Sequence, residues 1–269
     1  MSTPANPDWQ IAIAAHKPYR MPQDACYLPI HVGATLHPDV CVDMQQDNEG
    51  ENISEKNGEY SELTALYWLW KNSDAKHKGL VHYRRHFCKP GVRRAADAYD
   101  RIADAADFQN VFSETGTKVI LPKSRNYVIE TIGSHYRHTH PGEHLDVIRD
   151  ILSKDCPEYL PVFDSELKGT KAHMFNMLVA EAPVFDAYCA WLFPLLADLE
   201  KQLKDRRYDA FAARYPGRIS EILLDTWLET NGIAWAEMPV VSPEPIDWPA
   251  KAKGFLAAKF FGKKYERSF

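Results

Sequence analysis

Short apolar runs alternate with amphipathic stretches along the chain, and the two patterns predict strands and helices in turn. Residues 11–15 are an apolar run that ends at a basic turn, and residues 27–34 are a second run that ends in a glycine turn. Runs of this length bounded by proline or glycine are typical of buried strands. By the same criteria, further strands are predicted at residues 79–83, 118–122, 172–179 and 234–241.

Helices are predicted between these strands. Over residues 61–72, apolar side chains recur at i, i+3, i+4 and i+7, and Ser61 can cap the first turn. Strands that alternate with helices indicate α/β architecture, with a mainly parallel or mixed central sheet flanked by helices. The remaining predicted helices cover residues 94–110, 143–154, 183–199 and 219–230.

Two polar regions and the C-terminal segment do not follow this pattern. Residues 43–58 are expected to form a long loop, either mobile or ligand-binding, and residues 135–144 form a polar, histidine-rich region. Residues 251–269 hold six Lys or Arg and one acid, a net charge of +5, among interleaved phenylalanines. We therefore expect one domain over residues 1–250 and a basic amphipathic tail that either contacts anionic lipid or packs on the domain.

Composition excludes several classes of protein. Hydrophobic residues make up 45% and charged residues 26% of the 269 residues, which is a globular mixture. No apolar run approaches the ~18 residues of a membrane span, and no secretory signal is recognisable. The net charge of −5 argues against a general nucleic-acid binder. Five cysteines without a CxxC pair predict reduced thiols and a cytoplasmic protein.

The densest cluster of candidate site residues is His82-Tyr83-Arg84-Arg85-His86, at the end of a predicted strand. Guanidinium groups bind phosphate oxygens in bidentate geometry, so Arg84 and Arg85 could hold a diphosphate. His82 could donate to the same oxygens or orient a sugar hydroxyl. The alternative is a pair of arginines bound to surface acids, beside a histidine with internal partners.

A carboxylate near the start of a largely apolar helix is the best candidate for a general base. Glu221 would be partly buried there, and burial moves a carboxyl pKa toward the range that proton abstraction requires. The alternative is an i,i+3 ion pair with Arg218, worth only ~0.2–0.5 kcal/mol.

Four histidines, at positions 135, 138, 140 and 144, suggest a metal site because imidazole binds zinc. Their spacing matches no metalloenzyme signature and no cysteine joins them, so an acceptor-binding loop is the favoured interpretation. A metal-dependent hydrolase remains the alternative. Amides, a hydroxyl and a lysine at residues 52–57 suit sugar hydroxyls and ribose, or else form a solvated loop.

Seven segments, taken together and in order, resemble a known family. It is the bacterial capsular and exopolysaccharide glycosyltransferase family long catalogued as a domain of unknown function, which includes a galactofuranosyltransferase of O-antigen synthesis. The resemblance covers roughly residues 10–240. The segments are His16-Lys17-Pro18-Tyr19, residues 28–34 with Val32-Gly33-Ala34, residues 52–57, residues 62–72, residues 79–87, residues 174–177 and Ile219-Ser220-Glu221.

The resemblance implies a GT-A-like nucleotide-sugar-binding fold, with residues 1–250 as the catalytic domain. It also implies an inverting transfer of galactofuranose from UDP to a glycan acceptor in bacterial surface polysaccharide synthesis. GT-A enzymes usually hold a divalent ion with an Asp-x-Asp motif at a strand end, where this chain has His82–Arg85. Fixed arginine charge would then replace the metal, and UDP-sugar is the donor substrate with no separate cofactor. Residues 215–220 depart from the family's aromatic-glycine pattern.

The expected roles follow from this resemblance together with the residue chemistry. Glu221 is the expected base, with Glu62 in reserve, and the expected acceptor ligands are His135, His138 and Asn176. The acceptor would be a glycan that can be lipid-linked, at the cytoplasmic face of the inner membrane, with no nucleic acid involved. The alternative is a non-catalytic glycan-binding or scaffold protein. The expected donor-binding residues are His16, Lys17, Val32, Gly33, Asn52, Asn57, His82, Tyr83, Arg84 and Arg85.

Overall fold

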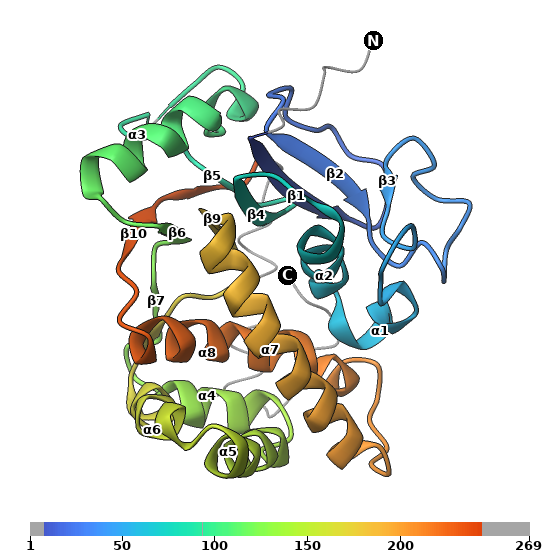
Figure 1. Ribbon diagram of the computed structural model, residues 1–269, viewed down its shortest axis with the longest axis vertical. Helices are drawn as coiled ribbons and strands as arrows, with labels where there is room; N and C mark the ends of the chain where they lie inside the picture. The colour runs from blue at the N-terminus through green and yellow to red at the C-terminus, as the bar shows by residue number, and fades with distance from the viewer. Residues whose placement is uncertain (1–7, 93, 244–269) are drawn as a thin grey trace.

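A computed structural model describes residues 8–92 and 94–243, so the predicted tail over 251–269 lies outside the described residues. A mixed seven-stranded sheet in the order β10-β6-β9-β4-β1-β2-β3 forms its centre (Figure 1). Strand β9 is antiparallel to both neighbours, and the other pairs are parallel. The strands are β1 Trp9–Ala15, β2 Tyr27–His31, β3 Gln45–Gln46, β4 His77–His82, β6 Val119–Pro122, β9 Leu178–Glu181 and β10 Trp235–Met238.

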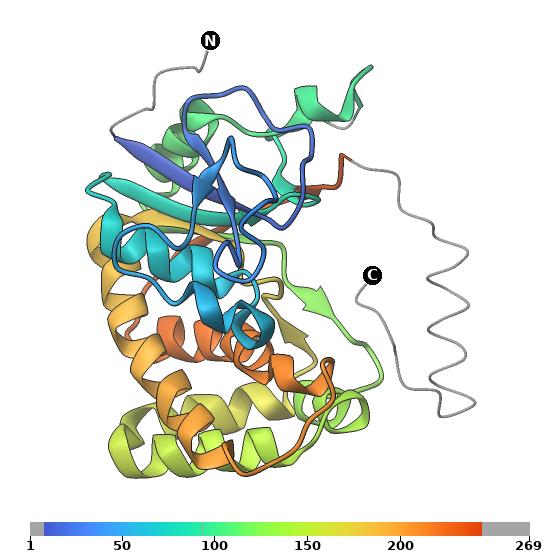
Figure 2. The ribbon, with the colours of Figure 1, turned by 90° about the vertical axis from the view of Figure 1, so that its right-hand side faces the viewer.

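Two small antiparallel sheets and a set of helices complete the described part of the fold. Figures 1 and 2 show α7 running from the central sheet toward α5, with α8 between the sheet and α4–α6. The small sheets are β5 His86–Phe87 with β11 Val240–Val241, and β7 Arg125–Asn126 with β8 Lys171–Ala172. The helices are η1 Ser54–Lys56, α1 Asn57–Tyr60, α2 Leu63–Asn72, η2 Ala98–Arg101, α3 Ala105–Thr115, α4 Ile132–Thr139, α5 Glu143–Asp155, η3 Pro157–Tyr159, α6 Leu160–Lys168, α7 Ala182–Leu203, η4 Ala212–Arg214 and α8 Tyr215–Thr230.

Both faces of the sheet are covered, because side chains of a strand alternate between its two faces. In β1, Ala12 and Ala14 face a large cluster shared with α2, α7 and α8, whereas Ile11 and Ile13 face a second cluster with α3. A strand that is buried on both sides reads as a continuous apolar run. This is why residues 11–15 were recognisable in the sequence.

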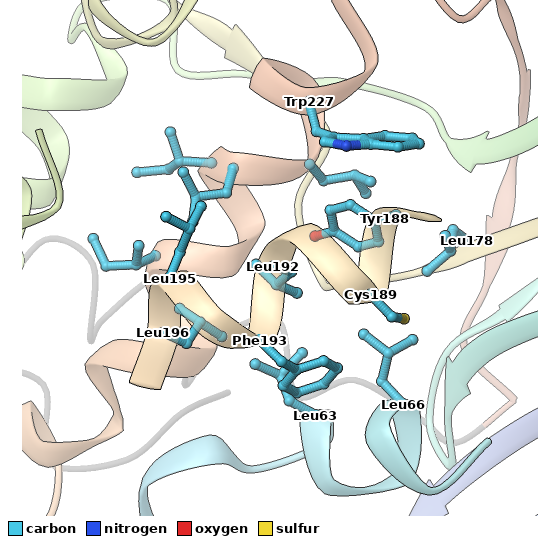
Figure 3. Close-up of a cluster of buried hydrophobic side chains, with 14 of the residues drawn as sticks. Leu63, Leu66, Leu178, Tyr188, Cys189, Leu192, Phe193, Leu195, Leu196 and Trp227 are labelled. Atoms are coloured by element: carbon cyan, nitrogen blue, oxygen red, sulfur yellow. The ribbon is translucent and has the colours of Figure 1, made fainter. Parts of the chain in front are cut away.

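Helix α7 forms the centre of the larger cluster (Figure 3). Leu192 and Phe193 lie near Leu63 on α2, and Tyr188 packs against Trp227 on α8 with ring centroids 5.4 Å apart. By length and composition alone α7 could cross a membrane, although the sequence predicted no span. In this fold 44% of the residues in its apolar window are buried, and α7 serves as a core helix.

The prediction of a loop over residues 43–58 was partly wrong, because the segment contains β3, η1 and the start of α1. A buried carboxylate organises it. Asp47 accepts hydrogen bonds from the backbone N–H groups of Gly33 and Ala34, at 2.8 and 3.0 Å, and from the Ser54 hydroxyl. The polar sequence therefore predicted a loop. In the structure, hydrogen bonds to the buried carboxylate of Asp47 hold this segment in an ordered conformation.

Other boundaries also differ from the predictions. Within 172–179 only the two ends are strands, because Phe175 and Asn176 have positive φ angles of 84° and 52° that break the extended chain. Residues 132–139 form helix α4, capped by Thr131, where a histidine-rich loop was expected. The predicted helix over 94–110 was wrong before Asp104, where the chain forms only the short 3-10 helix η2, and α3 begins after Asp104 caps it. Helix α6 was not predicted.

Candidate active site

A cavity of about 680 Å³ opens at the carboxyl ends of β1, β2 and β4. Ala14 pairs with both Ile30 and His82, so the residues that follow these three parallel strands meet at one edge of the sheet. Open α/β sheets bind their ligands at this edge. The lining residues are Ala14, His16, Val32, Asn57, Gly58, Ser61, Glu62, His82, Tyr83, Arg84, Arg85, Phe175, Arg214, Gly217, Arg218 and Glu221.

Aromatic rings form one wall of this cavity. Tyr83 stacks on Tyr19 with ring centroids 3.9 Å apart, and His16 meets the edge of Tyr83 at 5.0 Å. Burial and the neighbouring cation of Lys17 lower the pKa of His16, so its ring is neutral at pH 7. Burial raises the pKa of Tyr83 to about 12, which keeps its hydroxyl protonated. The wall is therefore uncharged and suited to stacking against a planar ring.

Four arginines line the same cavity. The guanidinium of Arg84 lies 5.0 Å from the centre of the Tyr83 ring, and that of Arg85 lies 4.5 Å from the Phe175 ring. Arg214 donates from Nε to the Ser61 hydroxyl at 2.9 Å. Burial and the nearby cations lower the pKa values of Arg85 and Arg218, although both stay charged. This concentration of positive charge favours an anionic ligand.

Two carboxylates lie beside the arginines. Burial and the negative charge of Glu62 raise the pKa of Glu221 to about 7, against the opposing effect of Arg218. One oxygen of Glu221 accepts a hydrogen bond from the Phe175 N–H at 3.1 Å, which orients the carboxylate. A carboxyl group with a pKa near the working pH can remove a proton and later release it. The arrangement has the chemistry of a general base.

The segment between β8 and β9 holds both carboxylates in place. Its Phe175 binds Glu221 through the backbone, and its Asn176 donates from Nδ2 to Glu62 at 2.8 Å. His82 donates from Nε2 to the Phe175 carbonyl at 2.6 Å and so ties the segment to β4. The positive φ angles of Phe175 and Asn176, and that of 53° at Ser61, are unfavourable for residues with a Cβ. Strained backbone of this kind gathers at functional sites.

His173 anchors the start of this segment. Its ring donates from Nδ1 to Asp225 at 2.7 Å and from Nε2 to Glu237 at 2.9 Å, and its backbone N–H donates to Asp225 at 2.8 Å. Burial alone would lower the pKa of His173, but the two carboxylates outweigh it and raise the pKa. His173 thus joins the segment to α8 and β10 through both of its ring nitrogens.

Most of the expected donor-binding residues line this cavity, together with both candidate bases. Three do not. Lys17 lies 5.0 Å from the Tyr19 ring, outside the lining. Asn52 donates to the carbonyls of Asn48 and Gly50 within its own segment. Gly33 lies behind the cavity, where its φ of 75° and the close approach of Asn57 leave no room for a side chain.

The expected acceptor ligands are separated in the structure. His135 lines a second cavity of about 190 Å³, which shares Phe175, Arg218 and Glu221 with the first. The side chain of His138 is 68% exposed and lines neither cavity. Its Nδ1 lies 3.0 Å from Oε1 of Glu130. Asn176 is buried and uses its amide on Glu62, Gly217 and Ser220. Asn176 therefore positions Glu62 rather than facing a cavity.

Sequence reasoning missed several lining residues. Phe175 was assigned to a strand, and no sequence signal indicates its positive φ. Arg214 and Ser61 reach the cavity only because η4 packs against α1. Arg218 was considered as an ion-pair partner of Glu221, but no such pair occurs among the ion pairs of the described residues, and its guanidinium lies over Phe211. The sequence signal for Arg218 as a lining residue was its position three residues before the predicted base Glu221.

The histidine-rich segment does not gather into a metal site in the described part of the chain, where no group of three or more His, Cys, Asp or Glu side chains could hold an ion. His135 donates from Nδ1 to Glu130 at 2.8 Å. Burial lowers the pKa of His140 to about 3 and that of His144 to about 4. The rings of His140 and His144 are therefore neutral at pH 7.

Comparison with known proteins relates this geometry to one solved structure and one family. The structure of WbbM, a bifunctional glycosyltransferase in its apo form, matches with a TM-score of 0.78 and 26% identity over 87% of this chain. The match spans 45% of the WbbM chain, so this chain corresponds to less than half of that protein. The predicted GT-A-like α/β fold, with its mixed sheet flanked by helices, is confirmed as a glycosyltransferase fold.

No curated protein matches the chain. The family model described as "Domain of unknown function (DUF4422)" matches residues 10–232, which include the strand edge, the arginines and both carboxylates of the cavity. With most of its length covered by that model, the chain belongs to the DUF4422 family.

Proposed function

We propose that this protein is an inverting glycosyltransferase that moves galactofuranose from UDP to a glycan acceptor in bacterial surface polysaccharide synthesis. The observation that carries the proposal is one cavity in which four arginines meet a carboxyl group of pKa about 7. Cations suit a departing diphosphate, and such a carboxyl suits proton removal from an attacking hydroxyl. The similarity to WbbM, a bifunctional glycosyltransferase, supports glycosyl transfer, and the resemblance of the seven sequence segments favours galactofuranose as the sugar.

In this proposal the cavity binds the donor along the sheet edge. The ring of Tyr83, supported by Tyr19, offers a stacking surface for the base, an interaction worth ~1–3 kcal/mol in nucleic-acid complexes. Arg84, Arg85 and Arg214 bind the diphosphate, because guanidinium groups match phosphate oxygens in charge and geometry. The sugar then lies between the diphosphate and the two carboxylates.

The reaction is a single displacement. The acceptor oxygen attacks the anomeric carbon while the bond between that carbon and the β-phosphate oxygen breaks, so the configuration inverts. Glu221 takes the proton of the attacking hydroxyl, and UDP leaves with the bonding electrons. Arginine charge stabilises the negative charge that develops on the diphosphate. Glu62 lies next to Glu221 and raises its pKa.

Fixed arginine charge makes transfer independent of a divalent ion in this proposal. We expect activity to survive EDTA, because no bound metal would be required to neutralise the diphosphate. Loss of transfer on chelation, restored by manganese or magnesium, would contradict the proposed metal independence. The proposal that the protein is a glycosyltransferase would still stand.

A panel of UDP-sugars tests the function directly. We expect saturation-transfer NMR to detect UDP and UDP-galactofuranose on the protein, and UDP release to require the galactofuranosyl donor. Glycan binding without any UDP binding or release would support the alternative, a non-catalytic glycan-binding or scaffold protein. Release of UDP from a different UDP-sugar would support the transferase activity but assign a different donor sugar.

We further propose peripheral contact with the cytoplasmic face of the inner membrane, through residues 251–269. Their net charge of +5 and their phenylalanines support attraction to anionic lipid, at ~1 kcal/mol per basic residue near the surface. The full chain should co-sediment with anionic vesicles at low salt, and a chain that ends at Pro249 should not. Loss of folding in the shorter chain would instead place the phenylalanines in the core.

A further inference from the structure

The second cavity adjoins the first across three shared residues, Phe175, Arg218 and Glu221. Its volume of about 190 Å³ is below the ~300–1,000 Å³ of pockets that hold drug-sized ligands, so it suits a single sugar unit. Its other lining residues come from β7, α4, α8 and the segments beside them. Those that the argument uses are Arg125, Tyr127, His135, Tyr136 and His140.

Two residues that line this cavity carry buried polar atoms without hydrogen-bond partners. Nε and Nη2 of Arg218 are buried and make no hydrogen bond, and neither does the buried Nδ1 of His140. Leaving a buried polar group unpaired is destabilising, and more so when the group is charged. Each such group in a native protein calls for an explanation, and a ligand that supplies oxygen atoms provides one here.

The geometry of these atoms indicates what kind of ligand fits. Nε and Nη2 form one edge of a guanidinium, which presents two parallel N–H groups to a pair of neighbouring oxygens. Phe211 lies 4.3 Å from the Arg218 guanidinium and supports it from one side. Adjacent hydroxyls of a sugar, or the carboxylate of a uronic acid, supply such an oxygen pair.

The rest of the lining matches a sugar ring. Tyr127 and His135 lie with ring centroids 4.3 Å apart, and with Tyr136 they present aromatic surface to the cavity. The apolar face of a sugar packs on aromatic surface, while its hydroxyls need a few placed polar groups. Arg125 lines the cavity from its exposed position on β7 and adds a second cation.

We propose that the second cavity binds the acceptor sugar, and that Nε and Nη2 of Arg218 donate to two neighbouring oxygens of that sugar. This inference rests on the proposed transfer reaction and names the place of its second substrate. Glu221 borders both cavities, so a hydroxyl of a sugar in the second cavity reaches the base and faces the donor in the first. The acceptor enters over α4 and β7, away from the sheet edge.

The experiment separates donor from acceptor binding with Tyr127→Ala and Arg125→Ala. Both residues line only the second cavity, and Arg125 is exposed, so its variant keeps the fold. Tyr67→Ala is the matched control, since Tyr67 makes ring contacts with Trp70 and Phe193 and lines neither cavity. The probes are the methyl glycosides of galactose, glucose and glucuronic acid. Saturation-transfer NMR measures their binding, and each is also tested as an acceptor.

We expect each variant to raise the acceptor KM at least tenfold, while UDP affinity and UDP release to water without acceptor stay at the wild-type level. Tyr67→Ala should change none of these. A loss of UDP affinity in the variants equal to the loss of transfer would overturn the proposal, because the cavity would then serve the donor. Unchanged acceptor KM in Arg125→Ala and Tyr127→Ala would also overturn it.

The same measurements keep the two proposals apart. If wild-type protein neither binds UDP nor releases it from a UDP-sugar, the proposed function fails. If UDP release occurs and the second-cavity variants transfer normally, only the acceptor site fails. A stronger signal from the glucuronide than from the glucoside would support a carboxylate at Arg218, and equal signals would support paired hydroxyls there.

Discussion

The two sides of the active-site cavity are built in different ways. On the sheet side, His16, Val32 and Tyr83 directly follow three parallel strands, and regular strand pairing brings them together. On the helical side, Phe175 and Glu221 come from an irregular segment and from α8. The first side needs only the sheet, whereas the second needs specific hydrogen bonds to hold an unfavourable backbone.

The two sides of the cavity also supply side chains with different chemical roles. The sheet side supplies a neutral aromatic wall and two arginines, which are groups that bind. The helical side supplies the carboxyl group whose pKa is raised to about 7, and the strained residues Phe175 and Asn176 that orient both carboxylates. Strain of about 1–3 kcal/mol per residue persists only where the surrounding structure fixes it. Substitutions on the two sides should therefore have different effects on binding and turnover.

The largest effect should follow from Glu221→Gln. The amide keeps the shape of the side chain but cannot take a proton, so we expect kcat to fall by ~10²–10⁴-fold with UDP affinity unchanged. Because the base must be ionised, wild-type kcat/KM should rise with pH up to about 7 and then level off. Glu62→Gln is the comparison. A larger loss of kcat in that variant would transfer the role of base to Glu62.

Substitutions on the sheet side should change the affinity for UDP. Arg84→Ala and Arg85→Ala should each weaken UDP binding by ~10–100-fold, since a hydrogen bond to a charged group is worth ~1.5–3 kcal/mol, and calorimetric titration measures this. Arg20→Ala is a matched control, because Arg20 also lies over a tyrosine ring but lines neither cavity. A variant that keeps wild-type UDP affinity would remove that arginine from the diphosphate site.

Anchoring of the strained segment should depend on pH through His173. Its pKa is raised above 6.5 in the folded protein, so the stabilisation is complete below pH 6.5 and is lost as pH rises through the raised value. We expect His173→Gln to lower Tm by several degrees at pH 6, with a smaller difference from wild type at pH 9. Thermal melts across this range measure the effect. A Tm difference that does not change with pH would show that the ring is uncharged.

The smallest effect should come from the turn behind the sheet edge. Gly33 and Gly91 both have φ of 75°, but only at Gly33 would a Cβ meet a neighbour, Asn57 Oδ1 at 2.7 Å. Alanine at either site should destabilise the fold by about 1 kcal/mol through the backbone. Gly33→Ala should in addition shift Asn57 and weaken UDP binding, which Gly91→Ala should leave unchanged. Equal UDP affinity in the two variants would make this turn purely structural.

The sequence by itself determined the three parallel strands β1, β2 and β4 and the binding groups at their carboxyl ends. Buried strands read as apolar runs, and parallel strands place the residues that follow them at one edge whatever the rest of the chain does. Arg84 and Arg85 directly follow residues 79–83, and His82 lies near the end of that run, so all three could be assigned to the site. Helix periodicity likewise placed Glu221 in an apolar helix, although α8 begins at Tyr215 and not at residue 219 as predicted.

Only the tertiary structure decided the helical side. The φ angles of Phe175 and Asn176 are held by His82, Glu221 and Glu62, residues distant in sequence, so no local pattern encodes them. The raised pKa of Glu221 and the unpartnered Arg218 depend in the same way on which charges and walls surround them. Burial and electrostatics act through space, and the fold decides which groups they couple.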